Sequence, residues 1–406
     1  MTIRKLSSPK IGDVRGFRSV GLAAGLKRSG KPDLGLIVSD GPCSAAGVFT
    51  RSRVPAAPVV IDREILKKNS TAIRAVVVHS GHANAATGAS GLAVACATAG
   101  ETARQVGAPA GSVLVCSTGV IGDLPPKDTL LRGIAAASKK ISSADRLFSR
   151  CILTTDKVEK ISGVQMRFPN GSTARMVGVC KGSGMIAPNM ATMLAFIVTD
   201  AAVAPAILQR ELRSIADETF NAVSVDGDTS TNDTVLLLAG GMSGAAVKAK
   251  TPSARVFSQG LRTVCEDLAQ QLVRDGEGAT KLIEVVVRGT RSPRSARRAA
   301  RTVAESLLVK TAMHGEDPNV GRVMAALGRS GIPELRPDRI DVSFNGVRAV
   351  RRGVVDRQSS AAALRKALGS RDIRIEIELS SGPSSGRFLS CDLSSEYVRI
   401  NSEYRT

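Results

Sequence analysis

Short apolar runs separated by glycine, proline and polar residues dominate the first third of the chain. They predict short strands at residues 33–39, 46–50, 58–61, 75–78 and 113–116. Between the last two runs, residues 92–106 have the alanine-rich composition of a helix. Alternating strands and helices are typical of α/β proteins, so we expect an α/β fold.

Two longer segments in the middle of the chain place apolar residues at helical spacing. They predict helices at residues 205–222 and 252–274, and the second helix stops at an Asp-Gly pair. A strand at residues 282–287 follows. Glu277 therefore falls in the loop between this helix and this strand, where functional residues are common.

Arginine is concentrated near the start of the last third of the chain. The spacing would put several of these residues on one helical face: Arg288, Arg291, Arg294, Arg297, Arg298 and Arg301. The stripe is either a solvated face at a domain junction or a polyanion contact. A glycine- and proline-punctuated segment at 310–331 follows, then a strand near 340–344, a helix at 361–368 and a strand at 373–379. We expect a smaller C-terminal α/β unit at about residues 290–406.

Composition narrows the functional classes. Of 406 residues 43% are hydrophobic, which supports a large buried core, whereas aromatic residues make up only 3% and offer few rings for stacking on bases. The net charge of +20 would attract anions, including small carboxylates. Residues 1–18 contain no apolar segment of signal-peptide type, and no apolar run approaches the length of a membrane span, so we expect neither feature. We expect a cytoplasmic protein that binds neither membrane nor nucleic acid.

Several short motifs imitate known sites but fail in detail. The seven cysteines are widely spaced and form no Cys-x-x-Cys pair, so we expect no disulfide framework and no metal site. Residues 25–32 match a phosphate-binding loop only until Pro32, which lacks the hydroxyl that would hold Mg²⁺. Cys180 lies in an elbow-like motif, and we interpret it as a buried thiol. Residues 226–233 depart from the EF-hand pattern. We interpret them as a loop whose Asp and Thr side chains hydrogen-bond to its own backbone and which supports a site without being one.

The most informative segment covers residues 181–200. Glycine and proline make it irregular up to Pro188, whereas residues 193–198 form an apolar run typical of a buried strand. Thr192 therefore stands where loop becomes strand. Threonine is a weak nucleophile, but cleavage of the bond before it would free an α-amine that can act as a base beside the hydroxyl.

This segment, KGSGMIAPNMATMLAFIVTD, strongly resembles the autoprocessing segment of the ornithine acetyltransferase (glutamate N-acetyltransferase) family of arginine biosynthesis. The resemblance extends along almost the whole chain. It includes GLIVSD (35–40), STGVIG (117–122), LTTD (153–156), VDGDTSTNDT (225–234), DGEGATK (275–281), GEDPN (315–319) and YVRINSEY (397–404).

The resemblance implies a layered α/β sandwich with N-terminal-nucleophile-type autoprocessing. Cleavage between Ala191 and Thr192 would leave an α chain of residues 1–191 and a β chain of residues 192–406, which would stay together as two copies of each. Thr192 would take the acetyl group from N-acetylornithine and pass it to glutamate in a ping-pong scheme, with no metal and no bound cofactor. Thr118 and Gly119 would form the oxyanion hole.

The same resemblance implies a set of substrate contacts, each with a chemical rationale. Lys181 can pair with an α-carboxylate, and Glu277 can receive an α-ammonium. Hydroxyl or amide groups complete the set: Thr154, Thr192, Asn401 and Thr406.

Alternative functions remain open at this point. His79, His82, Ala86, His314 and Val320 depart from the family pattern, so a paralogue with a shifted acyl donor is one alternative. A second is an N-terminal-nucleophile amidohydrolase or aminopeptidase that uses Thr192 but releases its acyl group to water. Acetyl-CoA could also serve as a donor, and the arginine stripe leaves nucleic-acid binding as an alternative from another class.

Overall fold

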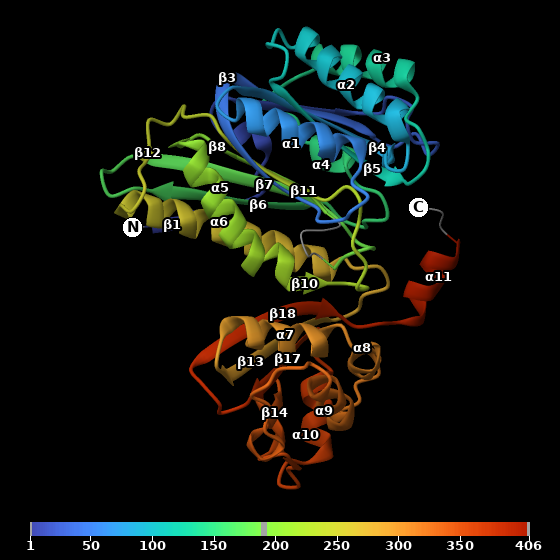
Figure 1. Ribbon diagram of the computed structural model, residues 1–406, viewed down its shortest axis with the longest axis vertical. Helices are drawn as coiled ribbons and strands as arrows, with labels where there is room; N and C mark the ends of the chain where they lie inside the picture. Colours follow the sequence, from blue (N-terminus) through green and yellow to red (C-terminus); the bar gives the residue numbers. More distant parts are fainter. Residues whose placement is uncertain (1, 188–192, 404–406) are drawn as a thin grey trace.

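Strand β3 (Leu34–Phe49) runs through the largest sheet of the described chain and joins its two halves. Its first part pairs with β2 (Phe17–Leu22) and β4 (Ile73–His82), and its last part pairs with β11 (Thr234–Ala239). The computed structural model describes residues 2–187 and 193–403. Over these residues the sheet has the order β1-β6-β7-β8-β11-β3-β4-β5 (Figure 1). Its other strands are β1 (Thr2–Lys5), β5 (Val113–Val120), β6 (Lys160–Arg167), β7 (Thr173–Lys181) and β8 (Leu194–Thr199).

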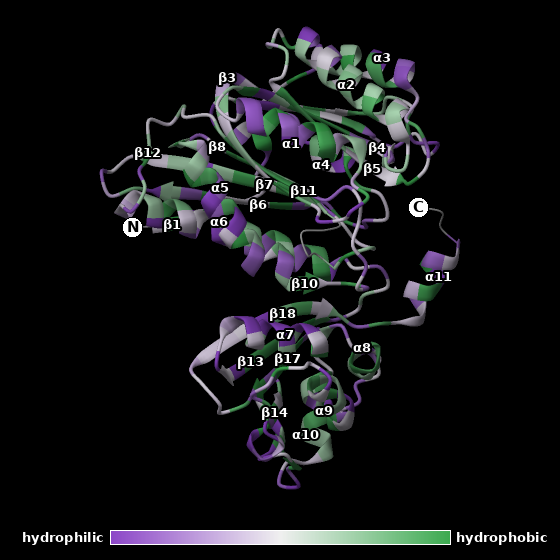
Figure 2. Cartoon of the chain, in the orientation of Figure 1, coloured by the Kyte–Doolittle hydropathy of each residue, from purple (hydrophilic) through white to green (hydrophobic). Residues whose placement is uncertain are grey.

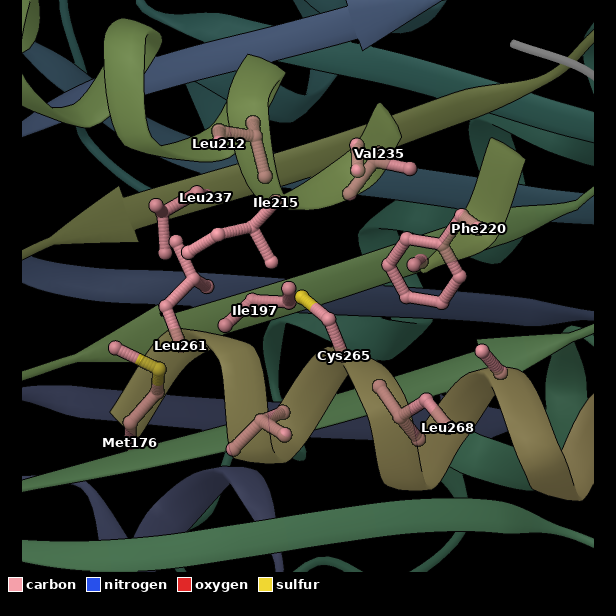
Figure 3. Packing of buried hydrophobic residues seen from close by; sticks show 14 of the residues in the cluster. Met176, Ile197, Leu212, Ile215, Phe220, Val235, Leu237, Leu261, Cys265 and Leu268 are labelled. Atoms are coloured by element: carbon pink, nitrogen blue, oxygen red, sulfur yellow. The ribbon is translucent and has the colours of Figure 1, made fainter. Parts of the chain in front are cut away.

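The two halves of this sheet pack face to face, and helices cover the two outer faces. Helices α5 (Pro205–Glu218) and α6 (Pro252–Arg274) cover β6, β7, β8 and β11. Figure 3 shows this contact, with Leu212, Ile215, Leu261 and Cys265 packed near Met176, Ile197 and Leu237. On the other half lie α1 (Ala57–Asn69), α2 (Gly88–Gln105) and α3 (Lys127–Ser138). This layered α/β sandwich confirms the fold class expected from the sequence.

Strand β8 is buried on both faces. Ala195 and Ile197 belong to the core under the helices, whereas Leu194, Phe196 and Val198 belong to the core between the two halves of the sheet. A strand covered on both sides is apolar at consecutive positions, which explains the unbroken run in the sequence. In Figure 2 the central strands of the sandwich are correspondingly green. Of the described helices, none combines the length and the apolar character that crossing a bilayer requires.

A second sheet, of order β10-β18-β13-β17-β14-β15-β16, forms a smaller unit below the sandwich in Figure 1. Its strands are β10 (Val223–Ser224), β13 (Leu282–Thr290), β14 (Asp341–Phe344), β15 (Val347–Arg351), β16 (Val354–Val355), β17 (Asp372–Glu378) and β18 (Ser384–Cys391). Four helices belong to this unit: α7 (Pro293–Ala304), α8 (Leu307–His314), α9 (Val320–Gly328) and α10 (Ala361–Leu368). The last helix, α11 (Ser395–Glu403), leaves this unit and returns to the side of the sandwich.

Short elements complete the described chain: α4 (Phe148–Cys151), the paired strands β9 (Ala202–Val203) and β12 (Ala246–Val247), and the 3₁₀ turns Ile11–Asp13, Phe220–Ala222 and Pro337–Arg339. Most predicted elements are confirmed, including the helix at 361–368 and the strands at 75–78 and 113–116. The helix predicted over 205–222 ends at Glu218, and a 3₁₀ turn follows.

Two predictions of local structure are wrong. The strands predicted at 33–39 and 46–50 are parts of one continuous strand, β3 (Leu34–Phe49), rather than two separate strands. Residues 58–61 lie in helix α1, where Pro58 occupies the first turn and its missing N–H costs no hydrogen bond. For the segment 310–331 the sequence predicted no element. It contains the end of α8 and all of α9, which Asn319 caps by accepting a hydrogen bond from the amide of Arg322.

Candidate active site

One pocket of the sandwich collects every predicted site residue that the structure describes. Thr118 and Gly119 line it from the end of β5, and the predicted substrate contacts Thr154, Lys181, Glu277 and Asn401 line it from four other segments. Positions that are far apart in the sequence therefore meet at one place. Ala191, Thr192 and Thr406 lie outside the described residues, so their predicted roles are carried into the proposal below.

Lys181 occupies the centre of this group. It is the last residue of β7, and its side chain is only 10% exposed. Its ammonium donates hydrogen bonds to Thr154 Oγ1 at 2.8 Å and to Thr118 Oγ1 at 3.3 Å. Burial lowers the pKa of Lys181, and the nearby carboxylate of Asp156 acts in the opposite direction. Lys181 thus connects a predicted oxyanion residue with a predicted substrate contact.

A buried chain of alternating charges supports Lys181 from behind. Asp156 Oδ2 lies 4.0 Å from Lys181 Nζ, and Asp156 Oδ1 accepts a hydrogen bond from Lys160 Nζ at 2.7 Å. Lys160 also donates to Asp275 Oδ2 at 2.5 Å, and its own side chain is fully buried. Burial alone would raise the pKa of Asp156, but the two lysines lower it to about 2. Asp156 is therefore an anion between two cations.

Asp156 also fixes the backbone around the pocket. Its carboxylate accepts hydrogen bonds from the amides of Thr154 at 3.0 Å and Gly182 at 2.7 Å. These two amides belong to the segments that carry Thr154 and Lys181 into the pocket. The LTTD motif had contributed only Thr154 to the predicted site, so the sequence interpretation missed its aspartate.

Glu277 provides an acidic side chain on the same pocket. It follows the C-terminus of α6 and is 5% exposed, and its Oε2 accepts a hydrogen bond from Asn401 Nδ2 at 2.8 Å. Its amide donates to the carbonyl of Ser183 at 3.0 Å, which ties this loop to the end of β7. Gly184 lies directly against the carboxylate, because a Cβ at this position would come within 2.4 Å of Glu277 Oε2. The pocket thus offers one cation and one anion.

Gly119 has a conformation and an environment that only glycine fits. Its φ is +126°, and a Cβ would lie 2.3 Å from the carbonyl carbon of Gly81 on the neighbouring strand β4. β4 and β5 lose their regular register here, at Gly81 and His82. This close approach fixes the backbone of Thr118 and Gly119 at the edge of the pocket.

Strand β8 begins beside the same group. Its first residue, Leu194, is paired with Lys181 on β7 and with Thr234 on β11. The carbonyl of Met193 accepts a hydrogen bond from the amide of Thr234 at 3.0 Å, and the amide of Met193 is hydrogen-bonded to Asp233. Asp233 is 4% exposed, and burial raises its pKa well above the usual value. The chain therefore enters β8 next to Lys181 and a buried carboxyl group.

The loop at residues 226–233 forms hydrogen bonds with other segments as well as within itself. Asp226 accepts hydrogen bonds from the amides of Met185 at 2.6 Å and Ile186 at 2.8 Å, which belong to the segment leading to the predicted cleavage point. Asn232 Nδ2 donates to the carbonyl of Ser117 at 2.8 Å, at the end of β5. The expected support of a site is present, but its partners lie on other segments. The crowding of polar residues was the only sequence signal for this role.

The remaining candidate motifs lie apart from this chemistry. Cys180 is fully buried in β7, and burial raises the pKa of its thiol, in agreement with the predicted structural role. The arginine stripe belongs to β13 and α7 of the smaller unit, where Arg288 pairs with Glu376 and Arg301 with Glu305. In the described part of the chain no three histidine, cysteine or acidic side chains are grouped so that they could share a metal ion.

Comparisons with known proteins agree along almost the whole chain. The profile of the ArgJ family matches residues 18–406. The arginine biosynthesis bifunctional protein ArgJ of Thermotoga neapolitana is 44% identical over 97% of this chain and 99% of its own. The glutamate N-acetyltransferase of Methanopyrus kandleri is 43% identical over 95% of this chain and 98% of its own. A crystal structure of the ArgJ protein from Bacillus halodurans is similar with a TM-score of 0.51 and 39% identity, covering 52% of this chain and 100% of the crystallised chain.

Proposed function

Because the chain belongs to the ArgJ family, we propose that it is an acetyltransferase that moves the acetyl group of N-acetylornithine to glutamate through acetyl-Thr192. The observation that carries this proposal is the convergence of Lys181, Glu277, Thr118 and Gly119 on one pocket beside the start of β8. A cation and an anion in one pocket suit a zwitterionic amino acid, and donors at a strand end suit an oxyanion.

The first step is the self-cleavage that frees the nucleophile. The Thr192 hydroxyl attacks the carbonyl carbon of Ala191, the C–N bond between the two residues breaks, and an ester forms in its place. Water then hydrolyses the ester, which leaves a carboxylate on Ala191 and a free α-amine on Thr192. The fragments have 191 and 215 residues (406 minus 191). The Bacillus halodurans chain corresponds to about half of this one, as expected for one of two such fragments.

Acetyl transfer then proceeds in two half-reactions. The α-amine of Thr192 takes the proton of its hydroxyl, whose oxygen attacks the acetyl carbon of N-acetylornithine. The negative charge that develops on the acetyl oxygen is stabilised by the Thr118 hydroxyl and the Gly119 amide. Ornithine leaves with the transferred proton on its α-nitrogen. The uncharged α-amine of glutamate then attacks the acetyl carbon of acetyl-Thr192, and the ester C–O bond breaks. The α-amine of Thr192 carries the proton lost by the glutamate nitrogen to the Thr192 oxygen, and N-acetylglutamate is released.

The charges of the pocket select the two substrates. Lys181 receives the α-carboxylate that N-acetylornithine and glutamate share. In N-acetylornithine the α-nitrogen is acylated and uncharged, so the cation available to Glu277 is the δ-ammonium. In glutamate that cation is the α-ammonium before it loses a proton. Thr154, Asn401 and Thr406 complete the contacts through hydroxyl and amide groups.

The test is mass spectrometry of the denatured protein combined with an acetyl-transfer assay. We expect two fragments, with the second beginning at Thr192. Thr192→Ala should remain one polypeptide without transfer activity, whereas Thr192→Ser keeps a hydroxyl and should still cleave. An intact, fully active wild-type chain would refute the mechanism.

The acceptor distinguishes this proposal from a hydrolase that uses the same threonine. Formation of N-acetylglutamate on addition of glutamate supports transfer, whereas acetate release that is independent of the acceptor supports hydrolysis. Acetyl-CoA as a second donor, the assembly of two copies of each fragment and a place in the cytoplasm stay predictions. Replacing N-acetylornithine by acetyl-CoA in the same assay tests the first of these.

A further inference from the structure

We propose that Asp156 is a positioning residue for catalysis, because it holds the Lys181 ammonium where that group orients the Thr118 hydroxyl toward the reacting carbonyl. This inference rests on the proposed acetyl transfer and deepens it. Lys181 would then serve the chemical step as well as substrate binding. Asp156 itself lies behind Lys181 and would act only through it.

The argument begins with the hydrogen-bonding capacity of the two groups. An ammonium can only donate, so the contact of 3.3 Å between Lys181 Nζ and Thr118 Oγ1 makes the hydroxyl oxygen the acceptor. The single proton of Thr118 must then point away from Lys181 and is free to meet a developing oxyanion. A hydroxyl that accepts from a cation is also a stronger donor.

An uncharged lysine would reverse this arrangement. A neutral amine carries a lone pair that can accept the Thr118 proton, which would turn the hydroxyl away from the oxyanion. The charge of Lys181 is therefore part of the geometry. The groups that face Lys181 are Asp156 and Lys160 behind it, Asp233 before β11, Glu277 after α6 and Lys27 after β2.

Two of these groups affect Lys181 in opposite directions. Asp156 raises the pKa of Lys181, which burial lowers, and Lys160 lowers it further. Removing the carboxylate of Asp156 should therefore let Lys181 lose its proton at a lower pH. Removing the cation of Lys160 should let Lys181 keep its proton to a higher pH. If this buried chain of charges had only a structural role, both changes would damage the enzyme, but they would not shift the pH at which Lys181 loses its proton in opposite directions.

The first experiment compares pH profiles of kcat for N-acetylornithine and glutamate. Asp156→Asn removes the charge and keeps one acceptor oxygen, which can serve the amide of Gly182 or of Thr154 but not both, and we expect its alkaline limb to move to lower pH. Lys160→Met combined with Asp275→Asn removes one buried charge of each sign, and we expect its alkaline limb to move to higher pH. Asp200→Asn is the matched control at the other end of β8, and its profile should equal that of the wild type.

The second experiment separates the oxyanion role of Lys181 from carboxylate binding. N-Acetyl-1,4-diaminobutane is the donor without its α-carboxylate, so Lys181 can assist its reaction only through Thr118. Asp156→Asn should lower kcat for this donor at least about tenfold at pH 8, as it does for N-acetylornithine, since one oxyanion donor is typically worth a factor of about 10²–10³. This comparison also decides the matter if the double variant does not fold.

Specific outcomes overturn the inference. Alkaline limbs that do not move, or that move in the same direction in both variants, contradict it. An Asp156→Asn effect that appears only as a higher KM for N-acetylornithine, and disappears with the decarboxylated donor, assigns Lys181 to carboxylate binding alone. Failure of the proposed function looks different, because the wild type itself would then lack the Thr192 fragment or the transfer to glutamate.

Discussion

Gly184→Ala tests whether the Glu277 carboxylate recognises the cationic group of the substrate. The added Cβ would lie 2.4 Å from Glu277 Oε2 and 2.5 Å from Cδ, whereas non-bonded atoms prefer about 3.5 Å. The carboxylate must therefore move by about 1 Å, and its hydrogen bond of 2.8 Å from Asn401 would lengthen or break. Gly184 has no positive φ, so alanine introduces no backbone strain.

The expected effect follows from the lost interaction. A hydrogen bond to a charged group contributes about 1.5–3 kcal/mol, which corresponds to a factor of roughly 10–150 in affinity. Steady-state kinetics should show the KM for N-acetylornithine rising by about that factor, with a smaller change in kcat. Gly100→Ala is the control, because a Cβ there meets nothing within 4 Å in helix α2. A folded Gly184→Ala enzyme with the wild-type KM would refute this role of Glu277.

Two further predictions concern cysteine reactivity and acid stability. Cys96 is exposed and the other six cysteines are buried, so a disulfide reagent should titrate about one thiol in the native protein and seven after denaturation; several rapidly reacting native thiols would contradict the packing. Burial lowers the pKa of His79 to about 3, so the free energy of unfolding should fall as the pH drops below the unfolded value of about 6.5, by about 2 kcal/mol between pH 8 and pH 5. His79→Gln should remove this contribution from urea unfolding curves, and an unchanged pH dependence would count against it.

The described residues that were predicted as a site converge on one pocket, whereas some of the elements around them were predicted wrongly. Thr118, Thr154, Lys181 and Glu277 could be named because they belong to motifs shared with a known family, and the structure brings them together. Residues 58–61 were mistaken for a strand because Val-Val-Ile suits a pleated surface equally well. In the structure they begin helix α1, which packs beside β5.

The sequence by itself determined the α/β character of the chain, its long amphipathic helices, the buried strand after residue 192 and the motifs that point to acetyl transfer. These properties depend on local periodicity and on residue types, which can be read position by position. Tertiary structure alone decided that Asp156, Lys160 and Asp275 form a buried charge chain behind Lys181. Lys181 and Asp275 are distant in sequence from Asp156 and Lys160, and the mutual attraction of these groups and their pKa values arise only when folding removes them together from water.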